Sequence, residues 1–132
     1  MSATNAFEAA LLALIFNNTD AANIGDATGL QGSGTAGDLY VSLHTADPGE
    51  TGDQTTNESA YTGYARVAVT RDSGGWTVSG TAPSEAANTA SVGFPACTGS
   101  TSTVTHFGIG TASSGAGHLL VSGALTSSLA VS

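Results

Sequence analysis

The sequence predicts a mainly β protein, an antiparallel β-sandwich or small barrel with one N-terminal α-helix. Only one stretch, close to the N-terminus, has helical periodicity, and about seven short strand-like runs follow it, separated by turn residues. The 132 residues include 18 Gly, and hydrophobic residues make up 40%, a composition that favours short strands and turns. This length predicts a single domain over 1–132, with a helix over 4–18, an extended loop or arm over 19–37 and a β-domain over 38–132.

Within 4–18 the apolar side chains recur at helical spacing and form one stripe, which consists of Phe7, Ala10, Leu11, Leu14 and Ile15. Asn5 with Glu8 three residues later resembles a capping box, and Asn17-Asn18 closes the helix. We expect the stripe to pack in the core, with docking on a neighbouring subunit as the alternative. The loop 19–37 shows no sustained period, so it is either an arm that reaches a neighbouring subunit or a surface excursion.

The central stretch of the chain, 38–69, contains two strand-like runs around a polar, acidic loop. Leu39, Val41 and Leu43 alternate with the polar or aromatic side chains Tyr40, Ser42 and His44, which is the period of a half-buried strand. The turn residues 46–49 end that run, because Pro48 removes a donor and Gly49 allows positive φ. The chain then returns as a second strand over 61–69.

Later strands are predicted over 76–79, 90–94, 104–109, 118–121 and 125–131, with a break at Gly123-Ala124 and a helix-permissive segment over 82–89. Pro95 ends the predicted strand 90–94. Trp76 is the largest apolar side chain, so we expect it to anchor the core rather than to stack on a ligand.

The charge balance restricts the partners. There is no Lys, Arg66 and Arg71 are the basic residues, and ten carboxylates give a formal charge of −8. A nucleic-acid partner or an anionic membrane surface needs clustered basic residues, so we expect neither. A solvated acidic face is the simpler interpretation of the carboxylates. The apolar run 9–16 is shorter than the roughly 20 residues that span a bilayer, and no basic residue precedes it, so synthesis in the cytoplasm is expected.

Candidate chemistry is sparse. His44, His106 and His118 could share a metal only if three strands brought them together, since no two lie at a zinc-binding spacing. The loop carboxylates Asp47, Glu50 and Asp53 could gather around calcium, but their spacing is not that of the twelve-residue calcium loop. Cys97 is single, so it forms no intrachain disulfide and is expected to be a small buried residue. We therefore predict no catalytic, cofactor-binding or metal residues, no cofactor and no enzyme activity.

Several segments carry a resemblance to a known family. They are LYVSLHTADPGETG and GYARVAV in the central stretch, then FPACTG, TVTHFGIG and SGAGHLLVSGALTSSLAV. Together, and in this order, they resemble a family of small virion proteins of tailed bacteriophages, commonly labelled tail fibre or structural protein. Members of that family usually continue with a further strand-like segment, whereas this chain stops at Ser132. The resemblance implies a virion component without enzyme activity.

Three functions remain open at this point. The first is a capsid decoration or cement protein that stabilises the head, because the chain shows none of the repeats or heptads of long fibres. The alternative is a tail-fibre or tail-tip component that contacts the host surface, and the third is a carbohydrate-binding β-module. The expected partners are the major capsid protein or other virion proteins and further copies of the chain, with a homotrimer expected by analogy to decoration proteins.

Overall fold

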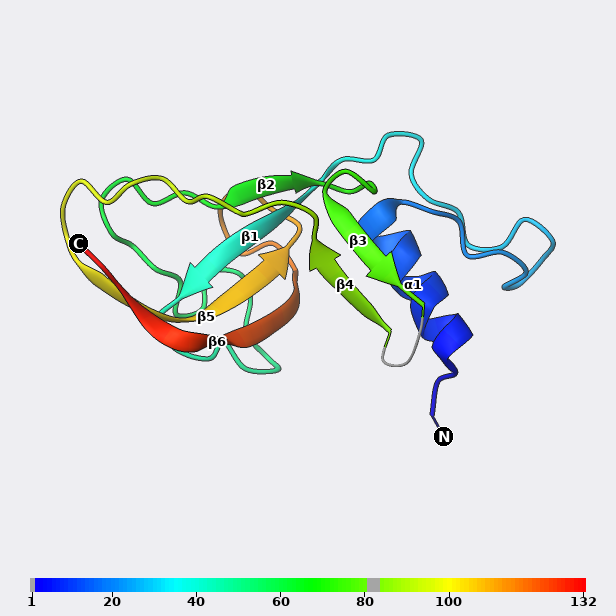
Figure 1. Cartoon of the computed structure of the whole chain (residues 1–132), viewed down its shortest axis with the longest axis horizontal. Helices are drawn as coiled ribbons and strands as arrows, with labels where there is room; N and C mark the ends of the chain where they lie inside the picture. Colours follow the sequence, from blue (N-terminus) through cyan, green and yellow to red (C-terminus); the bar gives the residue numbers. More distant parts are fainter. Residues whose placement is uncertain (1, 81–83) are drawn as a thin grey trace. The chain divides into compact units, whose positions relative to one another are not determined.

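The structure, a computed structural model that describes residues 2–80 and 84–132, confirms a mainly β chain with one N-terminal helix. Its elements are α1 (Asn5–Asn17), β1 (Asp38–His44), β2 (Val67–Thr70), β3 (Trp76–Ser79), β4 (Glu85–Asn88), β5 (Ser102–Gly110) and β6 (Leu119–Val131). One sheet has the order β2-β1-β5-β6, and β3 and β4 form a second sheet (Figure 1). All strand pairings given by register are antiparallel, and the described strands close no barrel.

The chain divides into two compact units. The helical unit consists of the chain up to Asp38 together with Val69–Ser91, and the sheet unit consists of Leu39–Ala68 together with Val92–Ser132. The predicted single domain over 1–132 stays a prediction.

In the helical unit, α1 begins one residue earlier than the predicted capping box implies. Thr4 is the N-cap, and its Oγ1 accepts a hydrogen bond of 3.4 Å from the N–H of Phe7, while Asn5 is already helical. A Thr hydroxyl satisfies one of the N–H groups that the first turn leaves free, so either residue type suits the cap. At the other end Asn18 adopts the left-handed conformation, with φ of 54°, and its N–H returns to the carbonyl of Ala13. Asn tolerates this region better than most residues, which is why the helix stops there.

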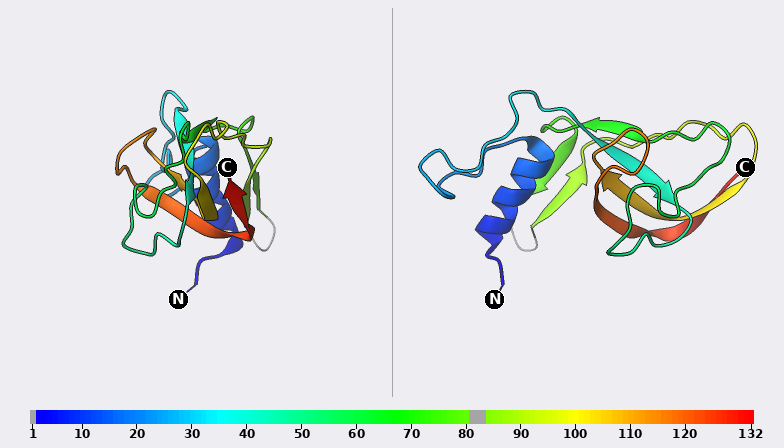
Figure 2. Two further views of the ribbon diagram at one scale, coloured as in Figure 1. Left: turned by 90° about the vertical axis from the view of Figure 1, so that its left-hand side faces the viewer. Right: turned by 180° about the vertical axis from the view of Figure 1, so that it is seen from behind.

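The helix packs against the β3–β4 hairpin (Figures 1 and 2). Phe16 is its one buried residue and meets buried Trp76 edge to face, with ring centroids 4.9 Å apart, so the prediction that Trp76 anchors a core is confirmed. The predicted stripe is only partly covered, since Phe7 and Ile15 are exposed. Because 9–16 is apolar all round, periodicity alone could not identify which face the hairpin covers.

The prediction of a helix-permissive segment over 82–89 is wrong where the hairpin is described. Glu85–Asn88 lies in the segment predicted as helix-permissive, but it is a strand whose register pairs Trp76 with Asn88 and Ser79 with Glu85. Alanine-rich segments have weak strand preference, and here the ladder with β3 overrides it. The part of the predicted segment at 82–83 lies outside the described residues.

In the sheet unit, β1 lies between β2 and β5 and forms the strand predicted from alternation. Its end is buried on both sides, because Ser42 and His44 are as inaccessible as Val41 and Leu43. The predicted return strand over 61–69 is a strand only at Val67–Thr70, and the chain before it is irregular. In this irregular segment, side-chain hydrogen bonds of Tyr64 and Arg66 take the place of a backbone ladder.

Two further strand predictions are wrong. The segment 90–94 forms no strand, and Phe94 instead packs on a core cluster around Leu43, Tyr61 and Val104. The last two predicted strands are one, β6, which Figure 2 shows as a long curved ribbon. Its register with β5 jumps from Leu129, opposite Val104, to Ala124, opposite His106. Such an irregularity bends a strand without ending it, so Gly123 and Ala124 stay in the ladder, opposite Phe107 and His106, and the bulge lies at 125–128.

Gly108 of β5 tests how tightly the sheet face is packed. A Cβ at Gly108 would lie 2.7 Å from both His44 Nε2 and Ser42 Oγ, and 2.8 Å from Leu119 Cδ1. We expect Gly108→Ala to lower the free energy of unfolding by about 1–3 kcal/mol, because these buried groups cannot move freely. Gly93→Ala, where no atom lies within 4 Å of the new Cβ, is the matched control. Chemical denaturation of both variants measures the difference, and equal midpoints would contradict the packing described.

Candidate functional site

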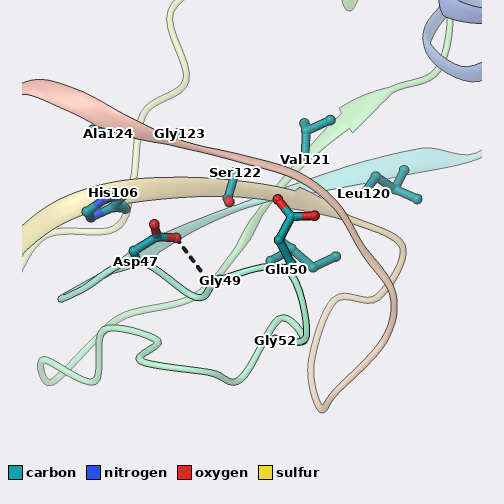
Figure 3. Close-up of a pocket in the computed structure, with 11 residues that line it drawn as sticks. Asp47, Gly49, Glu50, Gly52, His106, Leu120, Val121, Ser122, Gly123 and Ala124 are labelled. Atoms are coloured by element: carbon teal, nitrogen blue, oxygen red, sulfur yellow. Dashed lines mark hydrogen bonds between the residues drawn. The ribbon is translucent and has the colours of Figure 1, made fainter. Parts of the chain in front are cut away.

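A groove of about 560 Å³ lies in the sheet unit between the loop that follows β1 and one face of the sheet (Figure 3). The loop contributes Asp47 and Glu50, β5 contributes His106, and β6 contributes its first six residues. In Figure 3 the carboxylate of Glu50 points from the loop toward β6, and the hydroxyl of Ser122 points from β6 toward the loop. Pockets of this size hold small molecules or single side chains.

The loop is held at its neck by its own polar groups. The carboxylate of Asp47 accepts from the N–H of Gly49 at 2.9 Å, and its carbonyl accepts from the side chain of Asn57 at 3.0 Å. The N–H of Thr45 donates to the carbonyl of Asn57 at 2.8 Å. These bonds fold the excursion into a turn and place Glu50 at its tip.

Gln54 pins the middle of the loop to the connection between β5 and β6. The buried amide is paired with one backbone unit, since its Oε1 accepts from Ala112 N at 2.9 Å and its Nε2 donates to Ala112 O at 3.3 Å. A Cβ at Gly110 or Gly117 would collide with the Gln54 side chain. The two glycines therefore leave the space that the amide fills.

Arg66 is the centre of the network behind the groove. Its side chain is 2% exposed and forms a fork-like pair with Glu58, with 2.6 Å from Nε to Oε1 and 2.7 Å from Nη2 to Oε2. Two further N–H groups, one on Nη1 and one on Nη2, donate to the carbonyls of Ala112 and Gly115, both at 2.8 Å. One guanidinium thus joins the loop, the segment before β2 and the β5–β6 connection.

Tyr64 completes this network. Its hydroxyl donates to Glu58 Oε1 at 2.9 Å and accepts from the N–H of Leu43, in β1, at 3.0 Å. Burial, and after it the negative charge of Glu58, raises the pKa of the Tyr64 phenol far above the ordinary 10.0, although the Leu43 N–H and Arg66 act in the opposite direction. The hydrogen bond to Glu58 raises the pKa of Arg66, so the guanidinium stays charged.

The groove itself has a negative character. Both of its carboxylates are exposed, and the two arginines of the chain are engaged elsewhere. Arg66 belongs to the network above, and Arg71 binds Leu14 O at 3.0 Å and Asn18 Oδ1 at 2.8 Å in the helical unit. Anionic groups such as phosphate are therefore repelled, whereas neutral or cationic groups are tolerated.

The three histidines lie in different surroundings. His44 is buried between Ser42 Oγ and the carbonyl of Thr56, each 2.8 Å from a ring nitrogen. His106 lines the groove and His118 is exposed. In the described ranges no three His, Cys, Asp or Glu side chains gather as a metal site, and the expected absence of a metal stays a prediction.

Two of the carboxylates considered as calcium ligands, those of Asp53 and Asp47, accept hydrogen bonds from residues of their own loop. The Asp53 carboxylate accepts from Thr55 Oγ1 at 2.6 Å and from Thr55 N at 2.8 Å, and these bonds lower its pKa. Asp47 is bound to Gly49 in the same manner. Cys97 is half-buried against the core cluster, and its Sγ–H points to the carbonyls of Gly99 and Ser100, which suits the predicted packing role.

Sequence reasoning missed the residues that organise the site, namely Gln54, Glu58, Tyr64 and Arg66. The signal in the sequence was Arg66, a lone charge inside an otherwise apolar or aromatic run. A cation at such a position requires a buried partner, and the two acidic residues nearest in the sequence, Glu58 and Asp72, were the candidates.

The geometry is that of a β-rich structural module whose loops are fastened by buried polar groups. The chain belongs to the family described as "Podophage GP4 fiber I protein gp80", whose model matches residues 2–132. It is therefore a virion structural protein of a tailed phage and part of the phage particle, as the resemblance predicted. No curated protein matches the chain.

As for membranes, none of the helices formed by residues 2–80 and 84–132 has the length and apolar character needed to cross a bilayer.

Breaking the Arg66 pair tests the network. Glu58→Gln leaves the buried guanidinium without its counter-charge, so we expect the free energy of unfolding to fall by about 3–5 kcal/mol. Glu50→Gln removes the same charge from an exposed position and is the matched control, with a change within about 0.5 kcal/mol. Urea denaturation followed by far-UV circular dichroism measures both, and equal losses would show that the pair does not hold the loop.

The raised pKa of Tyr64 predicts an alkaline loss of stability. The folded phenol binds its proton more tightly than the unfolded one, so this contribution is intact below the ordinary value of 10.0 and is lost as pH rises above it. We expect Tyr64→Phe to be less stable at neutral pH, because it leaves the Leu43 N–H unpaired, yet to lose less stability between neutral and alkaline pH than the parent. Tyr40→Phe is the control, and a parental alkaline slope in Tyr64→Phe would contradict the prediction.

Proposed function

We propose that this chain is a non-enzymatic structural component of the phage tail fibre. The observation that carries the proposal is the match of residues 2–132 to a family described as a fibre protein. Because the match covers nearly the whole chain, the family's fibre description applies to this module as a whole and not to a short shared segment.

Capsid decoration, the function first favoured from the sequence, is now the second candidate. It relied on the absence of fibre repeats and heptads, but a fibre can also include small globular modules that attach or cap it. The family description favours the tail-fibre alternative. A carbohydrate-binding role has less support, because the described lining of the groove contains no Trp, Tyr or Phe side chain on which a sugar ring could stack.

The proposed partners are other virion proteins and further copies of the chain. Nucleic acid is not among them, because Arg66 and Arg71 both bind carbonyl and side-chain oxygens within the protein and leave no basic surface. Catalysis is not proposed either. Ser122 and His106 both line the groove, but the only hydrogen bond found for the His106 ring in the described residues goes to Thr105 Oγ1, at 2.8 Å.

Copy number and adsorption test the proposal. Quantitative mass spectrometry of purified particles should find few copies per virion compared with the major capsid protein. Particles that lack the protein should keep parental resistance to heat and should adsorb poorly to host cells. A copy number close to that of the capsid protein, together with heat-sensitive heads and normal adsorption, would establish the decoration role instead.

A further inference from the structure

The groove beside β6 combines an acidic wall with a partly apolar one. The loop after β1 contributes the carboxylates of Asp47 and Glu50, and β6 contributes six consecutive residues, Leu119–Ala124. Two of these, Leu120 and Val121, are 40% and 44% exposed. Because β6 is the end strand of its sheet, no further strand of the described residues closes that side of the groove. A side chain of another molecule can therefore enter between the two walls.

The two groove carboxylates have no Lys or Arg of their own chain beside them. The chain has no Lys, and Arg66 and Arg71 are its basic residues. Arg66 is 2% exposed and forms the salt bridge with Glu58 that the described residues contain, while Arg71 donates to oxygens of the helical unit. The charges of Asp47 and Glu50 therefore stay available to a cation from outside.

A second copy of this chain does not supply that cation. Each copy carries the same two arginines, and both are engaged inside their own unit. Two copies with a formal charge of −8 each also repel each other where their acidic loops meet. Charge complementarity therefore indicates a basic side chain of a different protein.

The arrangement of acceptors favours an ammonium group on an aliphatic stem. In Figure 3 the Glu50 carboxylate points toward β6 and the Ser122 hydroxyl points toward the loop, so acceptors face the groove from both walls. An ammonium directs three donors apart, whereas a guanidinium presents a flat fork that suits one carboxylate. The methylene groups of a lysine stem can cover apolar surface such as Leu120 and Val121 while the charge stays at the carboxylates.

We propose that the groove binds a lysine side chain of another virion protein. Asp47 and Glu50 receive the ammonium group, and Leu120 and Val121 cover its stem. The inference rests on the proposed structural role and gives that role a contact surface with a defined chemistry. Because the ion pairs are exposed to solvent, a single lysine side chain binds weakly, with a Kd in the millimolar range.

An isolated lysine side chain is the first probe. N-acetyl-lysine methylamide is titrated into the isotope-labelled full chain and followed by NMR, and the backbone amide signals of Asp47, Glu50 and 119–124 should shift and saturate. The norleucine analogue has a similar stem without the charge, so it should shift these signals much less. The arginine analogue should bind more weakly than the lysine one, because its planar group matches a single carboxylate better than two walls.

Two double variants separate the groove from the general acidity of the surface. Asp47→Asn with Glu50→Gln removes both groove charges, and Asn keeps an oxygen for the N–H of Gly49. This variant should bind the lysine probe about 2- to 25-fold more weakly. Asp38→Asn with Glu85→Gln makes the same two changes at exposed residues outside the groove, and each variant changes the formal charge from −8 to −6. The control should bind like the parent, and circular dichroism confirms that both are folded.

Phage particles test the identity of the partner. Virions that carry the groove variant should contain at least about twofold fewer copies of the chain than virions with the control variant, measured by quantitative mass spectrometry. Equal copy numbers would overturn the assignment to a virion partner.

The binding measurements can also overturn the proposal. Three results would do so: no saturable shift with the lysine probe, an equal response to the norleucine analogue, or equal weakening in the two double variants. Tighter binding of the arginine analogue would overturn the choice of lysine. Failed binding together with few copies per virion and defective adsorption would leave the fibre role intact. Confirmed binding with a capsid-like copy number would reject only the fibre role.

Discussion

The buried pair between Arg66 and Glu58 is the interaction on which the sheet unit depends. Residues 45–66 contain no strand or helix of their own, so no regular ladder satisfies their backbone or fixes their position. One guanidinium, with all its bonds to fixed oxygens, takes that place and joins the loop to the β5–β6 connection. The desolvation of such a pair is costly, and the gain is a single arrangement of long segments. The acidic groove exists because this arrangement holds the loop over the sheet.

The chain uses its two cations in the same manner. Arg71 serves the helical unit, where it binds Leu14 O and Asn18 Oδ1 at the C-terminal end of α1, the end at which the helix dipole favours positive charge. With both cations occupied inside their units, the surface charge consists of carboxylates, all of which precede residue 86. An acidic loop region and a neutral sheet edge result.

The features that differ from the prediction share a physical cause. The N-terminal helix is confirmed, but its apolar run 9–16 could have buried any face, and only the contact between Phe16 and Trp76 selects one. The alanines in Glu85–Asn88 are compatible with a helix or a strand, and pairing with β3 makes the segment a strand. The segment 90–94 alternates like a strand, yet it has no neighbour in a ladder, so Phe94 serves the core without a strand. In β6, Gly123 resembles a turn residue but stays paired opposite Phe107.

The sequence by itself determined the mainly β class, the N-terminal helix, the strands at 38–44, 76–79 and 104–109, and the membership of a phage virion family. These depend on local periodicity, turn chemistry and residue order, which are visible without coordinates. Only the tertiary structure decided the site. Gln54 meets Ala112 across 58 residues and Arg66 meets Gly115 across 49, and no local pattern encodes a contact at that separation. The open edge of β6 likewise follows from sheet order, because a strand's sequence does not specify whether a neighbour lies on one side of it or on both.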